Sequence, residues 1–169
     1  HYSSAATASL AYEAEDMTLL GTADIHADAD ASGGNQVRHA ITTTAWTPVL
    51  LTDLDSVGPL THTGTYRVWV RAADTGSVMR LRLVWGTAGL TLPVENAAAT
   101  FPEPTGYYLL DLGEVRLDAA PVGTHFWQGV IQAAAVDADS SGYVFIDKVW
   151  LIPVDEGYGT ARVGQAPTT

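Results

Sequence analysis

Two segments near the middle of the chain alternate apolar and polar side chains, and this pattern restricts the fold more than any other feature. In residues 65–72 the even positions Tyr66, Val68 and Val70 are apolar, and the odd positions 67, 69 and 71 are Arg, Trp and Arg. Successive side chains of a β-strand point to opposite faces, so the alternation predicts a strand with one buried face. Residues 78–85 resume the alternation after a turn, and residues 73–76 between the two segments predict a β-hairpin.

Further short segments of strand-forming residues follow one another along the chain, separated by Gly, Pro, Asp and Ser. They occupy residues 12–16, 17–25, 35–44, 45–51, 107–112, 115–117, 124–136 and 143–153. No amphipathic helix of useful length and no internal repeat is present in the sequence. Many short strands with turn residues between them predict an all-β fold, an antiparallel β-sandwich of the jelly-roll type.

The length of 169 residues suits one domain, which would bury about 70% of its unfolded surface. We expect a linker or leader at residues 1–10, the jelly roll at residues 11–153, and a C-terminal tail or linker at residues 154–169. The sequence begins at His1 without Met or a signal peptide. We therefore expect a fragment of a longer protein or a processed product.

The charge balance is strongly acidic, because 19 Asp and Glu oppose 8 Lys and Arg, for a net charge of −11. Such a surface disfavours nucleic acid and anionic membranes as partners. No stretch of the sequence approaches the roughly 20 apolar residues of a membrane span. The chain has no cysteine, which excludes disulfides and thiol chemistry within it.

Three acidic residues lie at the two ends of the expected domain. In a strand over residues 12–16, Glu13 and Glu15 would point the same way, and two adjacent carboxylates repel each other unless a cation or a shared proton lies between them. That face is either solvated or holds something positive. If the first and last strands are neighbours, Asp147 would complete a cage of hard oxygen ligands suited to Ca²⁺.

Two loops have the sequence Asp-Ala-Asp-x-Ser-Gly, at residues 28–33 and 137–142. This is the first half of an EF-hand loop, but the twelfth positions are His39 and Lys148 and not the bidentate Glu that such a loop requires. Asp and Ser before Gly also form ordinary turns. The turn interpretation is favoured.

Four motifs, taken in order, resemble carbohydrate-binding modules of families six and thirty-five. They are Tyr-Glu-Ala-Glu at 12–15, Ser-Gly-Gly at 32–34, Thr-Gly-Thr-Tyr-Arg-Val-Trp-Val-Arg at 63–71, and Ile-Asp-Lys-Val at 146–149. The resemblance spans roughly residues 11–151 and implies a β-jelly roll. It also implies that Glu13, Glu15 and Asp147 hold a structural Ca²⁺.

The same resemblance implies where a sugar would bind. In these modules sugar rings stack on aromatic residues of loops at one end of the sandwich. Residues 104–108 occupy the place where a Thr-Gly pair usually precedes a stacking Trp, so Tyr107 or Tyr108 would be the platform here, and only one of the two can face the loop surface. Expected polar partners of the sugar are Asn35, Gln36, Ser140 and Ser141.

A second resemblance is to jelly-roll domains of minor tail proteins of long-tailed bacteriophages. It rests on Leu-Gly-Glu-Val at 112–115 with Trp127 downstream, on Ile-Asp at 146–147, and on the run at 153–159. Two functions follow. The favoured one is a domain of a phage tail protein that contacts host-surface glycans and other tail-protein domains. The alternative is a carbohydrate-binding module appended to a secreted glycan-active enzyme. Both imply an extracellular or virion location.

The sequence favours a non-catalytic role. The side chains of Glu13 and Glu15 would point in the same direction from one strand, whereas the two carboxylates of a glycosidase lie on either side of the scissile bond. The sequence contains no Gly-x-Ser-x-Gly elbow, no phosphate-binding loop and no His-Glu-x-x-His.

Overall fold

The computed structural model describes residues 9–53, 64–76, 78–87, 94–103, 105–117 and 127–154. The elements in these ranges are strands and two single-turn 3-10 helices: β1 (Leu10–Glu13), η1 (Ala14–Asp16), β2 (Thr18–Leu19), β3 (Asp24–Ala27), η2 (Ser32–Gly34), β4 (Asn35–Ile41), β5 (Thr47–Asp53), β6 (Gly64–Thr75), β7 (Met79–Thr87), β8 (Val94–Glu95), β9 (Ala99–Thr100), β10 (Tyr108–Leu117), β11 (Trp127–Ala135) and β12 (Gly142–Pro153). Within these ranges, no helix has the length and apolar character needed to cross a membrane.

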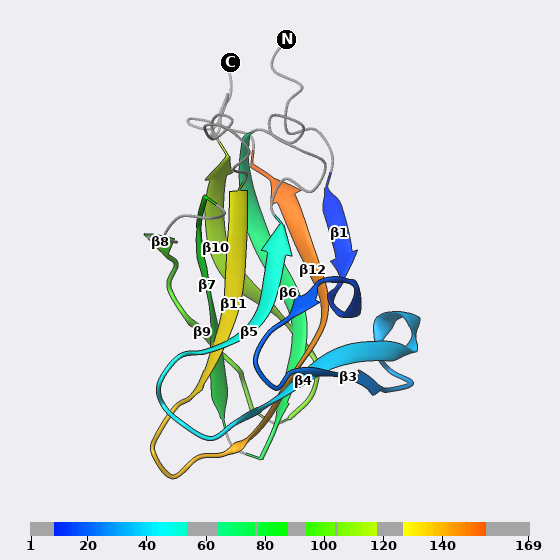
Figure 1. Cartoon of the computed structure of the whole chain (residues 1–169), viewed down its shortest axis with the longest axis vertical. Helices are drawn as coiled ribbons and strands as arrows, with labels where there is room; N and C mark the ends of the chain where they lie inside the picture. Colours follow the sequence, from blue (N-terminus) through cyan, green and yellow to red (C-terminus); the bar gives the residue numbers. More distant parts are fainter. Residues whose placement is uncertain are drawn as a thin grey trace.

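The strands form two antiparallel sheets that face each other, as Figure 1 shows. The first sheet has the order β10-β6-β12-β4-β3, with β1 paired to β12. The second has the order β2-β5-β11-β7-β8, with β9 paired to β7. The prediction of an all-β, antiparallel jelly-roll sandwich is confirmed.

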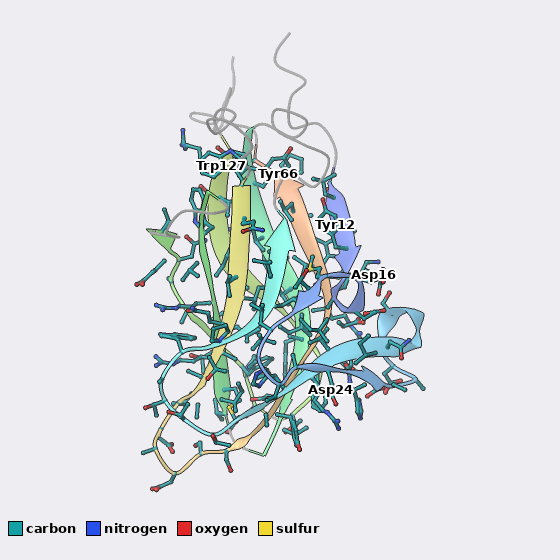
Figure 2. All side chains as sticks on the ribbon, in the orientation of Figure 1. Tyr12, Asp16, Asp24, Tyr66 and Trp127 are labelled. Carbon is teal, nitrogen blue, oxygen red and sulfur yellow. The ribbon has the colours of Figure 1, made fainter. Side chains whose placement is uncertain are left out.

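The core lies between the two sheets and is built from the alternating side chains, which Figure 2 draws as sticks with Tyr66 labelled. Tyr66, Val68 and Val70 on β6 are at most 1% exposed, and so are Leu83 on β7 and Ile131 on β11. Burying a side chain of this size contributes roughly 1.5–3 kcal/mol. The apolar face expected from the sequence is therefore the buried face.

The predicted hairpin at residues 73–76 is wrong, because β6 and β7 belong to different sheets. Alternation identifies the buried face of each strand but not the sheet that contains it. The chain turns at Gly76, whose φ is +92°, and crosses to the opposite sheet. The carboxylate of Asp74 supports this crossing by accepting the N–H of Met79 at 3.1 Å.

The first and last described strands lie side by side, since β1 pairs with β12 and Glu13 is opposite Lys148. The expected strand over residues 12–16 is only partly formed: β1 ends at Glu13, and η1 follows. The expected strand at 17–25 is likewise divided into β2 and β3. Residues 1–8 and 155–169, which include most of the expected linker and tail and residues 155–159 of the tail-protein resemblance, lie outside the described residues.

Candidate carbohydrate and cation site

A β-bulge in β12 sets the position of Asp147. The register of β12 against β6 shifts between Ile146 and Lys148, so Asp147 is the extra residue. A bulge re-aims the side chain it contains. The carboxylate of Asp147 is fully buried. Its Oδ2 accepts a hydrogen bond from Nη1 of Arg71 at 2.5 Å, and its Oδ1 accepts one from the backbone N–H of Ser32 at 2.8 Å.

The η2 turn brings the N-terminal acids to the same place. The hydroxyl of Ser32 donates to Oε2 of Glu13 at 2.8 Å, so one serine contacts both Glu13 and Asp147. Next to it, Gly33 has a φ of +68°, and a Cβ at this glycine would lie 3.8 Å from Oε2 of Glu15 and 3.9 Å from Oε1 of Glu13. The structure therefore gathers Glu13, Glu15 and Asp147 around residues 32–33.

Two oxygens of this acid cluster are buried without a hydrogen-bond donor: Oε1 of Glu13 and Oε1 of Glu15. Burial raises the pKa of the Glu15 carboxyl, and the charges of Glu13, Asp16 and Asp147 raise it further. Nζ of Lys148 lies 3.5 Å from Oε2 of Glu13, the oxygen that also accepts the Ser32 hydroxyl. Unpaired buried carboxylate oxygens are costly, and they have the chemistry of a hard cation's ligands.

The cluster is not a complete ligand set, because both oxygens of Asp147 are engaged by Ser32 and Arg71. Among the described residues, no group of three His, Cys, Asp or Glu side chains is arranged to hold a metal ion. Each carboxylate oxygen has two lone pairs, so Asp147 retains capacity for a further partner. The free acceptors of the cluster are therefore Oε1 of Glu13 and Oε1 of Glu15, while both oxygens of Asp147 already have a partner.

Tyr107 is fixed from two sides next to this cluster. The guanidinium carbon of Arg71 lies 3.9 Å from the ring centroid of Tyr107, and the Tyr107 hydroxyl donates to Oε1 of Gln36. Burial raises the pKa of this hydroxyl, as do the nearby charges of Asp28 and Asp147, so it remains a donor at neutral pH. The ring is half-buried and held in one orientation.

The other predicted sugar-binding residues are placed differently. Tyr108 packs against the core cluster. The Gln36 side chain is 1% exposed and is used internally, since its Nε2 also lies 3.4 Å from the Asp28 carboxylate. Ser140 is 9% exposed and donates to Asp137 within its own loop, while Ser141 is exposed. Asn35 begins β4 directly after η2.

Both Asp-Ala-Asp-x-Ser-Gly loops are turns stabilised by their first aspartate. Oδ1 of Asp28 accepts the N–H of Asp30 at 2.8 Å, and Oδ1 of Asp137 accepts the N–H of Asp139 at 3.1 Å. These are local side-chain to backbone bonds of the Asx type. The turn interpretation is confirmed.

Arg71 and Ser32 connect the site, and sequence reasoning did not identify either residue as functional. Arg71 bonds both Asp147 and the backbone oxygen of Asp30, and it stacks on Tyr107. Its position on the outward face of β6 could be read from the alternation. Its partners could not, because they depend on the bulge at Asp147 and on the η2 turn.

No protein-family model matches this chain, and no curated protein matches its sequence. Solved structures do match it. The family 35 carbohydrate-binding module from Clostridium thermocellum is 21% identical, and the match covers 85% of this chain and 98% of that module with a TM-score of 0.50. The module CBM6cm-2 of Cellvibrio mixtus lichenase 5A, solved with cellotriose, is 19% identical over 86% of this chain and 98% of that module, also with a TM-score of 0.50. The chain has the jelly-roll fold of carbohydrate-binding modules.

A module of this fold also occurs within larger chains. The xanthan lyase of Paenibacillus is 20% identical, with a TM-score of 0.53. That match covers 85% of this chain but only 13% of the lyase, so the chain spans a small part of that enzyme. At these identities the likeness is one of fold.

Proposed function

We propose that this domain is a non-catalytic glycan-binding module in which Tyr107 is the ring that stacks on a sugar. The fold that it shares with carbohydrate-binding modules supports this proposal. The orientation of Tyr107 supports it more specifically, because Arg71 covers one face of the ring and Gln36 holds its hydroxyl. A ring that is already fixed loses little conformational entropy when a ligand stacks on it.

The apolar C–H face of a sugar would lie against the free side of the Tyr107 ring. Polar partners for the hydroxyl groups would come from Asn35 and Ser141, because Gln36 and Ser140 already bond within the protein. In this arrangement Gln36 and Arg71 position the platform and do not contact the sugar. Tyr108 supports the loop from the core side.

A structural Ca²⁺ at Glu13, Glu15 and Asp147 belongs to the same proposal. The two buried carboxylate oxygens without donors support it. A bound cation would supply charge neutralisation at the junction of β1 and β12, which would fix the η2 turn beside the Tyr107 platform. The ligands contributed by this chain would be Glu13 and Glu15, with Asp147 shared with Arg71.

Two settings are compatible with a glycan-binding module. The xanthan lyase likeness favours a module that is one part of a larger glycan-active enzyme, because there the same fold lies within an enzyme chain. The phage-tail setting, with host glycans and other tail domains as partners, rests on the sequence resemblance at 112–115 and 153–159. Either setting is extracellular or on a virion.

A glycan array probed with the purified domain tests this function. We expect binding at mid-micromolar affinity or tighter to at least one glycan class, and loss of that binding in Tyr107→Ala. The matched control is Tyr143→Ala, because Tyr143 is 42% exposed on another strand, β12. Equal loss in both variants would move the contact to the sheet face, and an array without any binding would overturn the function itself.

A further inference from the structure

Arg80, on β7, carries a charge that no acid balances within the described part of the chain. The cationic side chains that form an ion pair at 3.5 Å or less include Arg38, Arg67, Arg71, Arg82 and Lys148. Arg80 has no such pair with any described residue, and its Nε is buried without a hydrogen-bond acceptor. A buried donor without an acceptor is costly and therefore uncommon in native proteins. In a chain with a net charge of −11, an arginine without a carboxylate beside it is unexpected.

Arg80 and Arg82 point outward from the second sheet and are held by one indole ring. Leu81 between them is fully buried in the core, so the two arginines lie on the outer face of β7. The guanidinium carbon of Arg80 lies 4.6 Å from the ring centroid of Trp46, and that of Arg82 lies 4.4 Å from it. Trp46 directly precedes β5, a strand of the same sheet, and is not part of the core cluster. Arg80, Arg82 and Trp46 together form the Arg–Trp cluster.

Arg82 is fixed in this cluster by two further neighbours. Its Nε donates to Oε1 of Gln132 at 2.7 Å, and its Nη1 lies 3.3 Å from Oε1 of Glu95. Gln132 lies opposite Arg82 on β11. Two arginines are therefore opposed by one glutamate among the described residues, which leaves the cluster positive. Like charges held against one ring repel each other, and a bound anion would relieve this repulsion.

We propose that the Arg–Trp cluster binds the anionic group of an acidic polysaccharide, a carboxylate or a sulfate ester. The proposal rests on the glycan-binding function proposed above, and it adds a second contact on the outer face of the second sheet. A guanidinium is always charged, and its N–H groups form a planar fork that matches the oxygens of such an anion. The donors that Arg80 offers are Nη1 and Nη2, because its Nε is buried. Since Trp46 already holds this guanidinium, little side-chain entropy is lost on binding.

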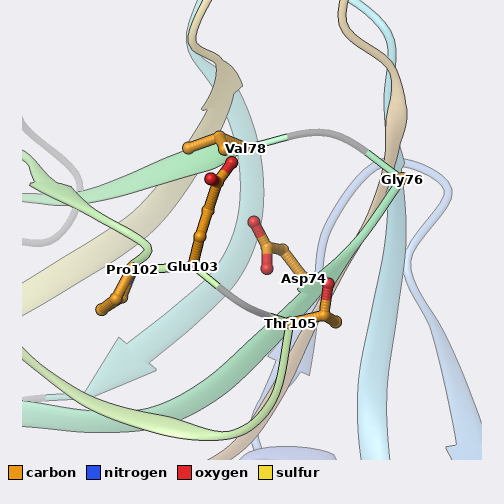
Figure 3. A pocket seen from close by; sticks show the side chains of 6 residues that line it. All are labelled: Asp74, Gly76, Val78, Pro102, Glu103 and Thr105. Carbon is orange, nitrogen blue, oxygen red and sulfur yellow. The ribbon is translucent and has the colours of Figure 1, made fainter.

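The charge of the remaining surface restricts where an acidic polysaccharide can lie. The hollow in Figure 3, of about 60 Å³ beside the β6–β7 turn, is lined by Asp74 and Glu103 and by no cation. Its carboxylates repel an anionic chain, whereas the Arg–Trp cluster attracts one. The net charge of −11 also disfavours the dense charge of nucleic acid at the cluster. A polysaccharide with separated anionic groups fits both conditions.

Isothermal titration calorimetry in about 0.15 M salt, which screens charges beyond roughly 8 Å, tests the inference with two matched pairs of probes. One pair is a galacturonate tetrasaccharide and its methyl ester. The other pair is a sulfated carrageenan tetrasaccharide and its desulfated form. Both treatments remove the negative charge and keep the sugar rings. We expect a charged probe to bind at least about tenfold more tightly than its neutral form, and the pair that shows this difference identifies the anion as carboxylate or sulfate.

Variants locate the contact. Arg80→Gln is expected to reduce the preference for the charged probe about tenfold, because it removes both the charge and the fork. Arg80→Lys keeps the charge without the fork, so its preference is expected to be intermediate. The matched control is Arg38→Gln, which removes an arginine paired with Asp24 in the other sheet and is expected to keep the preference. Because Arg80 has no ion pair to lose within the described residues, Arg80→Gln should keep its Tm within about 3 °C of the wild type.

The outcomes distinguish this site from the module function. Equal binding of the charged and neutral members in both pairs, or a preference that Arg80→Gln and Arg38→Gln reduce alike, overturns the anion site. Neutral glycans bound in a Tyr107-dependent way would then leave the module function standing. Absence of binding to every glycan overturns both.

Discussion

Asn96 connects the two sheets through one side-chain amide, and its removal is expected to destabilise the fold. Its Oδ1 accepts the indole N–H of Trp85 at 3.1 Å, and its Nδ2 donates to the backbone oxygens of Leu112 at 2.8 Å and Glu114 at 3.0 Å. Trp85 lies on β7 in one sheet, whereas Leu112 and Glu114 lie on β10 in the other. Between the two acceptors, Gly113 has a φ of +89°.

The expected loss follows from these three hydrogen bonds. Each contributes a net 0.5–1.5 kcal/mol, so Asn96→Ala should lower the free energy of unfolding by about 3 kcal/mol. For a domain of this size, 1 kcal/mol corresponds to a shift in Tm of roughly 2–4 °C. The Tm of the variant should therefore fall by about 6–12 °C.

Urea unfolding gives the free energy, and a thermal melt gives the Tm. The matched control is Asn35→Ala, which removes the same atoms from the chain's other asparagine, and no described residue hydrogen-bonds to the Asn35 side chain. This control should stay within about 0.5 kcal/mol of the wild type. Asn96→Asp, which keeps the acceptor for Trp85 and loses both donors, should fall between them. If Asn96→Ala costs no more than Asn35→Ala, the amide does not hold the sheets together.

Two further predictions concern the acidic residues. Removing divalent cations with a chelator should lower the Tm of the wild type by about 5–10 °C, as expected for a ligand present at about a hundred times its Kd. Glu15→Gln should abolish this effect. An unchanged melting curve of the wild type in the chelator would exclude the cation. The pKa of Asp74 is raised in the folded state, so the ionised form is disfavoured there, and stability from this group is present below its unfolded pKa and is lost as the pH rises through its folded pKa. Relative to the wild type, Asp74→Asn should therefore gain stability in urea unfolding as the pH rises above about 4. Parallel pH profiles of the two proteins would contradict this assignment.

Alternation predicted the faces of the strands but not the way they are combined. It identified Tyr66, Val68 and Val70 as a buried row, which they are. The same rule places Asp74 on that inward face, where it is 4% exposed. Alternation is a property of one strand, however, so it cannot tell a hairpin from a crossing between sheets. That distinction depends on long-range pairing of β6 with β12 and of β7 with β11.

The acid cluster was predictable in its members but not in its geometry. Glu13, Glu15 and Asp147 do gather, although the route is a 3-10 turn and a bulge, and not two regular strands. Neither irregularity has a distinct local sequence pattern here. The contact of Ser32 with two of the acids depends on both. Groups that bond across 115 residues of sequence, as the backbone N–H of Ser32 and the carboxylate of Asp147 do, are fixed by the assembled sandwich.

Arg71 makes the acid cluster and the aromatic platform parts of one structure. Its guanidinium bonds the buried carboxylate of Asp147 and also stacks on Tyr107, so the orientation of the ring depends on the bulge in β12. A cation at Glu13 and Glu15 would share Asp147 with Arg71 and would thereby change the support of the ring. A weakening of glycan binding by a chelator would consequently not require direct contact between sugar and metal. Because Glu15→Gln removes a ligand of the cation, it should weaken glycan binding as the chelator does, and the chelator should then have no further effect on this variant.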